Sequence, residues 1–146
     1  MGKITIEEFA DRTSECMQSI SKEYFRHHGE DIHKVKITLP QMVTLETLRR
    51  QGELKMTDLA AAMNVTTAAM TGLSDRLVRD GYIERASDPD DRRVVKIKLA
   101  EKGKKIANHV AEEKRKTVIR MFSVISQAER EKYLKILKHI REHLNG

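Results

Sequence analysis

Residues 66–99, TTAAMTGLSDRLVRDGYIERASDPDDRRVVKIKL, decide the fold, because a helical repeat changes there to an alternating one. Over residues 66–80, small and apolar residues recur at the three- and four-residue spacing of a helix. Gly81 follows, at a position where a helix end favours glycine. The segment therefore predicts a helix with a polar outer face. Its predicted buried stripe is Ala69, Met70, Leu73 and Leu77.

The residues after this helix predict a β-hairpin. Residues 82–86 form a short strand, residues 87–93 (SDPDDRR) form a turn rich in Asp and Pro, and residues 94–99 form a second strand. In the second strand Val95, Ile97 and Leu99 share one side, which is the period-2 pattern of a half-buried strand.

Two further helices are predicted before residue 66. Thr38 and Pro40 are typical of a helix start, and this helix ends at Gly52. The next helix covers residues 57–63, with Thr57 as its cap. Asn64 ends that helix, and Val65 is expected to bury the turn that follows. Two short helices, a tight turn and a hairpin are the organisation of a winged helix-turn-helix, so the predicted class is mainly α with a small β-hairpin wing (α+β).

This organisation predicts a DNA-binding surface, because a helix fits the major groove and its early residues reach base edges. Threonine hydroxyls can donate hydrogen bonds, an alanine methyl can contact a thymine methyl, and a glycine allows close backbone approach. Arginines reach phosphates, which fix register without reading sequence. The residues expected at the major groove or its phosphates are Thr66, Thr67, Ala68, Thr71, Gly72, Arg76 and Arg79.

The hairpin tip is expected to add contacts outside the major groove. Arg92 and Arg93 are placed near the flanking minor groove, where narrow A·T tracts attract arginine. The alternative is a solvated turn, or salt bridges to Asp88, Asp91 or Asp75. We expect one arginine to be structural and the other to touch DNA. Asp75 would repel phosphate, so it is expected to pair with a wing arginine.

Amphipathic helices are predicted on both sides of this block. Residues 6–28 carry an apolar face, residues 27–36 are predicted to be a loop, and helical spacing resumes over 102–125 and 127–144. The outer stripes exceed what one small domain can bury, which predicts dimerisation. They include Phe9, Ile20, Leu137, Ile140 and Leu144. The predicted division is an N-terminal dimerisation helix (1–34), a winged helix-turn-helix lobe (35–101) and C-terminal dimerisation helices (102–146).

Charge and composition narrow the function. The net charge of +6 permits nucleic-acid binding, but residues 1–100 hold 16 Lys and Arg against 16 Asp and Glu, whereas residues 101–146 hold 12 against 6. The local placement of a few basic side chains must therefore provide affinity for DNA in the middle of the chain.

Several function classes have no support in the sequence. No apolar run approaches the roughly 18 residues that cross a bilayer, no secretory signal is visible, and the single cysteine suits a cytoplasmic protein. No Gly-rich phosphate loop, Cys/His zinc spacing or nucleophile elbow is present. We therefore expect no enzyme, no cofactor, no metal site and no membrane partner.

The chain resembles the MarR family of bacterial and archaeal regulators. The resemblance is most specific from Asp88 to Gly103, where D-x-x-D-R-R is followed by an alternating strand and LAEKG, and the order of elements matches over almost the whole chain. Two departures are Asp90, where the family usually has Arg, and Ala100, where it usually has a Thr that caps the next helix. Such a cap contributes about 1 kcal/mol.

The resemblance implies a homodimer with interlocked terminal helices and a small-molecule or redox effector that releases DNA. A two-fold dimer would read half-sites about 10 base pairs apart on a near-palindrome. Repression is the commoner behaviour of the family. The alternative is a protein- or RNA-binding module on the same fold without an operator, which the balanced charge of residues 1–100 and Asp90 favour.

Three groups of residues are candidates for a sensor. Peroxide-sensing relatives carry a reactive cysteine on the first helix, but Cys16 is expected on an apolar face, where a cysteine is usually inert. His27, His28, His33 and His109 are candidate metal ligands, and His109 and Glu113, four apart on one helix, could share a metal. However, adjacent His27 and His28 would point in different directions on a helix, and the dense histidine run of zinc-binding relatives is absent. The family places an effector cleft beside the dimer helices, which Tyr24, Met42 and Leu45 could line, with core packing as the alternative.

Overall fold

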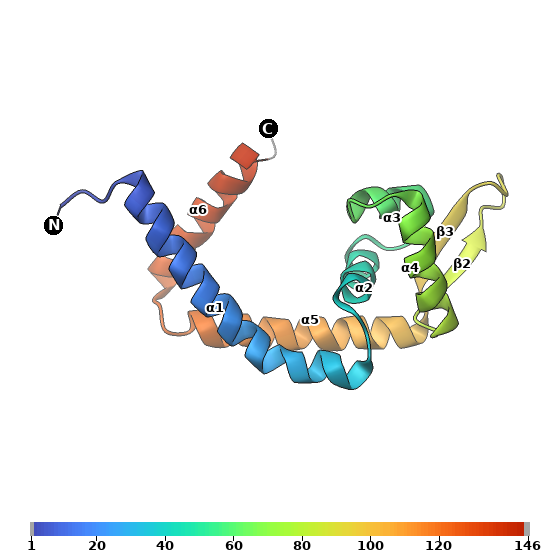
Figure 1. The fold of residues 1–146 in the computed structure, drawn as a ribbon, viewed down its shortest axis with the longest axis horizontal. Helices are drawn as coiled ribbons and strands as arrows, with labels where there is room; N and C mark the ends of the chain where they lie inside the picture. Colours follow the sequence, from blue (N-terminus) through green and yellow to red (C-terminus); the bar gives the residue numbers. More distant parts are fainter. Residues whose placement is uncertain (1, 145–146) are drawn as a thin grey trace. The chain divides into compact units, whose positions relative to one another are not determined.

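The computed structural model describes residues 2–144, and the side chains of residues 2–26 and 36–144. It is mainly α with one small antiparallel sheet (Figure 1), which confirms the predicted class. The elements are α1 (Ile6–Val35), α2 (Leu39–Gln51), β1 (Leu54–Lys55), α3 (Met56–Ala62), α4 (Thr67–Arg79), β2 (Ile83–Ser87), β3 (Val95–Leu99), α5 (Glu101–Phe122) and α6 (Gln127–Leu144). None of the described helices is both long and apolar enough to cross a lipid bilayer.

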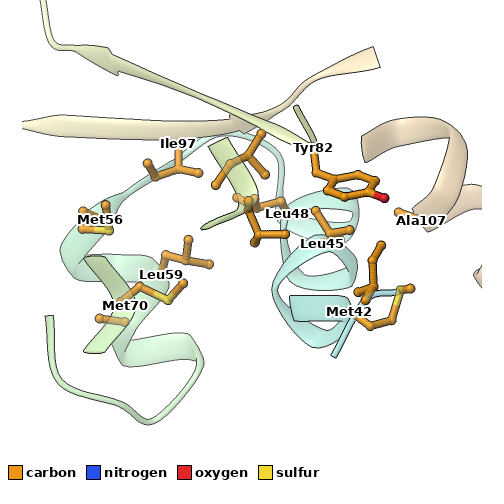
Figure 2. Close-up of a cluster of buried hydrophobic side chains, with 13 residues drawn as sticks. Met42, Leu45, Leu48, Met56, Leu59, Met70, Tyr82, Ile97 and Ala107 are labelled. Atoms are coloured by element: carbon orange, nitrogen blue, oxygen red, sulfur yellow. The ribbon is translucent and has the colours of Figure 1, made fainter. Parts of the chain in front are cut away.

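The chain forms two compact units, residues 1–111 and residues 112–146. The core of the first unit is built by α2, α3, α4 and the sheet (Figure 2). Leu45, Leu59, Met70, Leu77 and Ile97 are fully buried there. Burial of a side chain of this size contributes about 1.5–3 kcal/mol, so this cluster holds the inner face of α4 in place.

Polar caps set the ends of α2 and α4. The hydroxyl of Thr38 accepts a hydrogen bond from the amide of Gln41, whose side chain accepts one from the amide of Thr38, and α2 ends at Gly52 with φ of 78°. The hydroxyl of Thr66 accepts from the amide of Ala69 at the start of α4. The chain leaves α4 through Gly81, where φ is 79°. These caps lie where the sequence predicted the helix ends.

The sheet has three strands in the order β1-β3-β2. Ile83 pairs with Leu99 and Ser87 with Val95, so β2 and β3 form the predicted hairpin. On the other edge of β3, Leu54 pairs with Ile97 and Lys55 with Lys96. Sequence patterning missed β1, because two residues are too few to show an alternating period.

The predicted loop over residues 27–36 is wrong. α1 continues to Val35, and the chain leaves the helix only at Lys36, where φ is 53°. The apolar helical pattern breaks over this stretch, which contains Gly29, but an interior glycine costs a helix only about 1 kcal/mol relative to alanine. No proline interrupts this segment, so its glycine can be accommodated. The side chains of His27, His28 and His33 lie outside the described residues.

Two predictions about the turn region of the helix-turn-helix are also wrong. Met56 begins α3 and Lys55 takes the cap position, so Thr57 lies inside the helix. Val65 is exposed, because the amides of Asn64 and Val65 close the turn by bonding to the carbonyls of Ala61 and Ala60, both at 3.0 Å.

The predicted buried stripe of α4 is right at Met70 and Leu77, which are both fully buried, and wrong at Ala69, which is exposed. Ser74 is fully buried instead, and its hydroxyl donates to the sulfur of Met56 at 3.7 Å. The cause is the helical period, since Met70, Ser74 and Leu77 lie four and three residues apart on one face.

The second unit is held together by the end of α5 and by α6. The rings of Phe122 and Tyr133 lie 5.3 Å apart, and Ser126 forms a reciprocal capping box with Glu129 at the start of α6. The guanidinium of Arg130 donates to the carbonyls of Phe122 and Ile125, which satisfies the end of α5. Between these helices runs an open apolar groove of about 700 Å³, which Arg130 and several aliphatic side chains line.

Gly103 lets the first turn of α5 pack directly on the chain that leaves α4. A Cβ at this position would lie 1.9 Å from the carbonyl oxygen of Tyr82. That oxygen also accepts a hydrogen bond from the amide of Ala100 at 3.0 Å, so it cannot move away freely.

We expect Gly103→Ala to lower the free energy of unfolding by about 1–3 kcal/mol or more, because the methyl group overlaps backbone. Gly72→Ala is the matched control, since nothing lies within 4 Å of its Cβ and Ala favours a helix interior by about 0.5–1 kcal/mol. Urea denaturation of both variants measures the difference, and equal stability of the two would contradict the packing described.

Candidate nucleic-acid interface

The outer face of α4 is polar and solvent-exposed along its length. Thr67, Ala68, Gly72 and Arg76 are exposed, and Thr71 is half-buried. The hydroxyl of Thr71 donates to the carbonyl of Thr67 at 2.8 Å, and that of Thr66 serves as the helix cap. Thr67 forms no side-chain hydrogen bond in the described part of the chain, so its hydroxyl is available to a ligand.

The arginines of α4 differ in their surroundings. Arg79 forms an ion pair with the neighbouring Asp80 at 3.2 Å. Arg76 has no ion-pair partner within the described ranges 2–26 and 36–144, so its charge is uncompensated. A long basic side chain without an ion-pair partner, at the edge of a helix face, is suited to contact a phosphate rather than a base edge.

The wing turn is built by aspartate side chains. Asp88 forms an ion pair with Lys96 at 2.8 Å and accepts a hydrogen bond from the amide of Asp90 at 2.9 Å. Asp91 accepts from the amide of Arg93, also at 2.9 Å. Hydrogen bonding from Lys96, followed by that from the Asp90 amide, lowers the pKa of Asp88, and the same pair raises the pKa of Lys96. The two aspartates therefore order the turn and leave the side chains of Arg92 and Arg93 free to extend.

Asp75 ties α4 to the wing. Its carboxylate lies 2.7 Å from the guanidinium of Arg85 on β2. The sequence predicted that Asp75 pairs with a wing arginine, and Arg92 and Arg93 were the arginines considered. Neither of them has an ion-pair partner among residues 2–26 and 36–144. Arg85 was missed because a strand of five residues gives no signal for which side chain faces a helix.

A groove of about 410 Å³ lies where α4, the start of α3 and the wing meet. No acidic side chain among the described residues lines it, although residues 1–100 as a whole carry balanced charge. The groove brings the predicted residues Thr67, Thr71 and Arg93 together with three that the sequence did not single out for binding. Its polar lining is Lys55, Thr57, Thr67, Thr71, Arg85 and Arg93.

The first turns of α5 add positive charge beside the lobe. Lys102 donates to the carbonyl of Asp80 at 2.8 Å, and its ammonium lies 4.3 Å from the centre of the Tyr82 ring. Lys102 therefore caps the end of α4, a structural role that its sequence position did not reveal.

The described sensor candidates differ in their surroundings. Cys16 is exposed rather than buried. Met42 and Leu45 are buried members of the core. Tyr24 is half-buried with a pKa raised by burial, and its ring packs edge-on against Phe25. Glu113 forms an ion pair with Lys116 at 2.8 Å, and no group of three metal-binding side chains occurs among the described residues.

This chain is similar to known proteins in both sequence and fold. The sequence profile of the MarR family matches residues 37–95. The uncharacterized HTH-type transcriptional regulator YfiV of Bacillus subtilis (strain 168) is 34% identical over 98 residues, which cover 67% of this chain but only 61% of that relative. The uncharacterized HTH-type transcriptional regulator YsmB of the same organism is 33% identical over 100 residues, 68% of each chain.

Two further similarities concern proteins whose names are more informative. The HTH-type transcriptional repressor YetL of Bacillus subtilis (strain 168) is 29% identical over 132 residues, 90% of this chain and 76% of that relative. The crystal structure of Streptococcus pneumoniae FabT in complex with DNA superposes with a TM-score of 0.83 over 93% of this chain and 97% of that chain, at 23% identity. At this identity the likeness to FabT establishes the fold.

The pKa of Asp88 allows a prediction about the wing at low pH. A lowered pKa means that ionised Asp88 stabilises the turn fully above the ordinary Asp value of about 3.9, and that this stability is lost as the pH falls through the lower, folded value. The amide resonance of Asp90, followed by NMR, should therefore titrate with a midpoint below about 3.9. Asp88→Asn should remove this low-pH component of the titration, and its persistence in that variant would contradict the described turn.

Proposed function

Because this chain belongs to the MarR family of DNA-binding transcriptional regulators, whose members are not enzymes, we propose that it represses transcription as a homodimer on a near-palindromic operator. The observation that carries the proposal is the continuous surface formed by the outer face of α4, the groove and the wing. The name of the relative YetL supports repression, and the complex of FabT with DNA supports the use of this fold on a duplex. The cytoplasm is the proposed location.

We assign the reading of bases to the start of α4 and the fixing of register to the arginines. Thr67 and Ala68 are exposed at the amino-terminal end of the helix, where a recognition helix reaches base edges. Thr66, Thr71 and Gly72 shape that end, and Arg76 and Arg79 lie further along for the phosphates. Arg92 and Arg93 extend from the ordered wing turn, which Asp88 and Asp91 hold together.

The proposed dimer rests on apolar faces that this chain leaves uncovered. Phe9 and Ile20 on α1 are 52% and 50% exposed, and Ile140 on α6 is 48% exposed. Exposed apolar residues that recur on one face of a helix mark an association surface, because single chains rarely leave such stripes in water. A two-fold dimer through residues 1–34 and 102–146 would present two α4 helices to half-sites about 10 base pairs apart.

A small-molecule effector that releases DNA completes the proposal, by analogy with the family. Its site is not assigned to Met42 or Leu45, since both are committed to the core. The exposed position of Cys16 permits a thiol-based signal, but a lone exposed cysteine does not make a sensor.

Selection of bound duplexes from a random DNA pool at moderate salt tests the proposed function. Enrichment of a near-palindrome with half-sites about one helical turn apart would support it. A folded dimer that enriches no motif would overturn operator binding and favour a protein- or RNA-interaction module on the same fold.

On the selected operator, Arg93→Ala should weaken binding about equally for all operator variants, because phosphates and groove shape carry no base identity. Thr67→Ala should change which bases are preferred at one position of each half-site, by about 1–3 kcal/mol. Fluorescence anisotropy with a panel of single-base variants separates the two effects. If both substitutions lowered affinity without changing preference, this division of roles would be wrong.

The dimer can be tested on α6. Ile140→Glu should convert the dimer to a monomer at micromolar concentration, because an ionised carboxylate on the apolar stripe loses its water on association. His139→Glu places the same charge one residue away on a different face and should remain dimeric. Analytical ultracentrifugation distinguishes the two, and a dimeric Ile140→Glu variant would contradict the assigned surface.

A further inference from the structure

The groove between α4 and the wing contains two cations that the protein does not neutralise. Lys55, on β1, is exposed and has no ion-pair partner in the described part of the chain. Arg93 precedes β3 and likewise has none there, although its backbone amide is fixed by Asp91 at 2.9 Å. The third basic residue, Arg85, is already compensated by Asp75 at 2.7 Å. The groove therefore offers two uncompensated positive charges from separate elements.

Hydroxyl groups in the groove also differ in what they can offer. The hydroxyl of Thr71 already donates to the carbonyl of Thr67. The hydroxyl of Thr57 forms no hydrogen bond within the described ranges, and Thr57 follows Lys55 by two residues at the start of α3. A donor with no internal partner beside two free cations is suited to a singly charged oxyanion that accepts several hydrogen bonds.

The position of the groove identifies that oxyanion. When a recognition helix occupies a major groove and the wing reaches the neighbouring minor groove, one sugar-phosphate strand runs between them. The groove lies between these two parts of the protein, so it faces that strand. A second polar groove on the lobe has a different character, because it is lined by Glu53, Glu84 and Glu101 as well as by basic residues.

We propose that Lys55, Arg93 and Thr57 clamp a single DNA phosphodiester in this groove, beside Arg85, whose charge Asp75 neutralises. This inference rests on the proposed function and adds Lys55 and Thr57, to which the sequence patterns and the wing motif gave no role in binding. The clamp couples the helix-turn-helix to the wing through one phosphate. Arg92 does not line the groove, so it remains available to the minor groove.

The experiment uses the full-length protein and the selected operator, with a neutral methylphosphonate placed at one backbone position at a time. On the unmodified operator, Lys55→Ala and Arg93→Ala should each reduce affinity about tenfold, which is the effect of losing a charged hydrogen bond. At one backbone position in each half-site, the methylphosphonate should remove both losses, so that wild type and both variants bind equally.

Lys98→Ala is the matched control, because Lys98 is exposed on β3, pairs with Glu84 at 3.4 Å and lines the other groove. It should bind like wild type at every backbone position. Thermal melting of Lys55→Ala should match that of wild type, since the side chain makes no ion pair among the described residues.

Two results would overturn the clamp while leaving operator recognition intact. In the first, Lys55→Ala binds the unmodified operator as tightly as wild type. In the second, the losses of Lys55→Ala and Arg93→Ala are removed by methylphosphonates at different positions. Failure of the wild-type protein to select any operator is a different outcome, which overturns the proposed function and the clamp together.

Discussion

The packing of one side of α4 into the core is the constraint on which the rest of the lobe depends. Met70, Ser74 and Leu77 are fully buried against α2, α3 and the sheet. This packing fixes the orientation of α4 about its own axis. Thr67, Ala68 and Arg76 are then exposed as a consequence, and not through contacts of their own. A core substitution such as one at Met70 would therefore alter the proposed DNA-facing surface without touching it.

A lobe with balanced charge can still face a polyanion if its acidic groups are neutralised locally. Asp75 is paired with Arg85, Asp88 with Lys96 and Glu84 with Lys98. The cations without partners in the described part of the chain include Lys55, Arg76 and Arg93, and they border the outer face of α4. Exposed ion pairs of this kind contribute little to stability, typically below about 1 kcal/mol. Their main effect is to neutralise the acidic side chains, so that the charge that remains beside α4 is that of the cations without partners.

Sequence patterns predicted α4 and the hairpin because each signal there is local. Helical spacing, the Thr66 cap and the positive φ of Gly81 depend on neighbouring residues only. Contacts between elements carry no such signal. The partner of Asp75 is ten residues away on β2, and Lys55 enters the groove only because β1 pairs with β3. The helix over 27–35 was missed for the opposite reason, since a local break in the apolar pattern was interpreted as a loop, although the segment contains no proline.

The way the lobe is built limits how an effector could release DNA. The core, the Asp75–Arg85 pair and the packing of Gly103 on Tyr82 join α4, the wing and the first turn of α5 into one unit. Opening that unit would expose several buried side chains, each worth about 1.5–3 kcal/mol, which exceeds the 1–3 kcal/mol of a typical allosteric coupling. In the proposed dimer, a change in the spacing of two intact lobes would need no such exposure. A mismatch between the spacing of the lobes and the helical repeat of the operator would then weaken binding at both half-sites together. Because separation or rotation of intact lobes exposes no core side chains, it is a less costly route to release than melting of the wing.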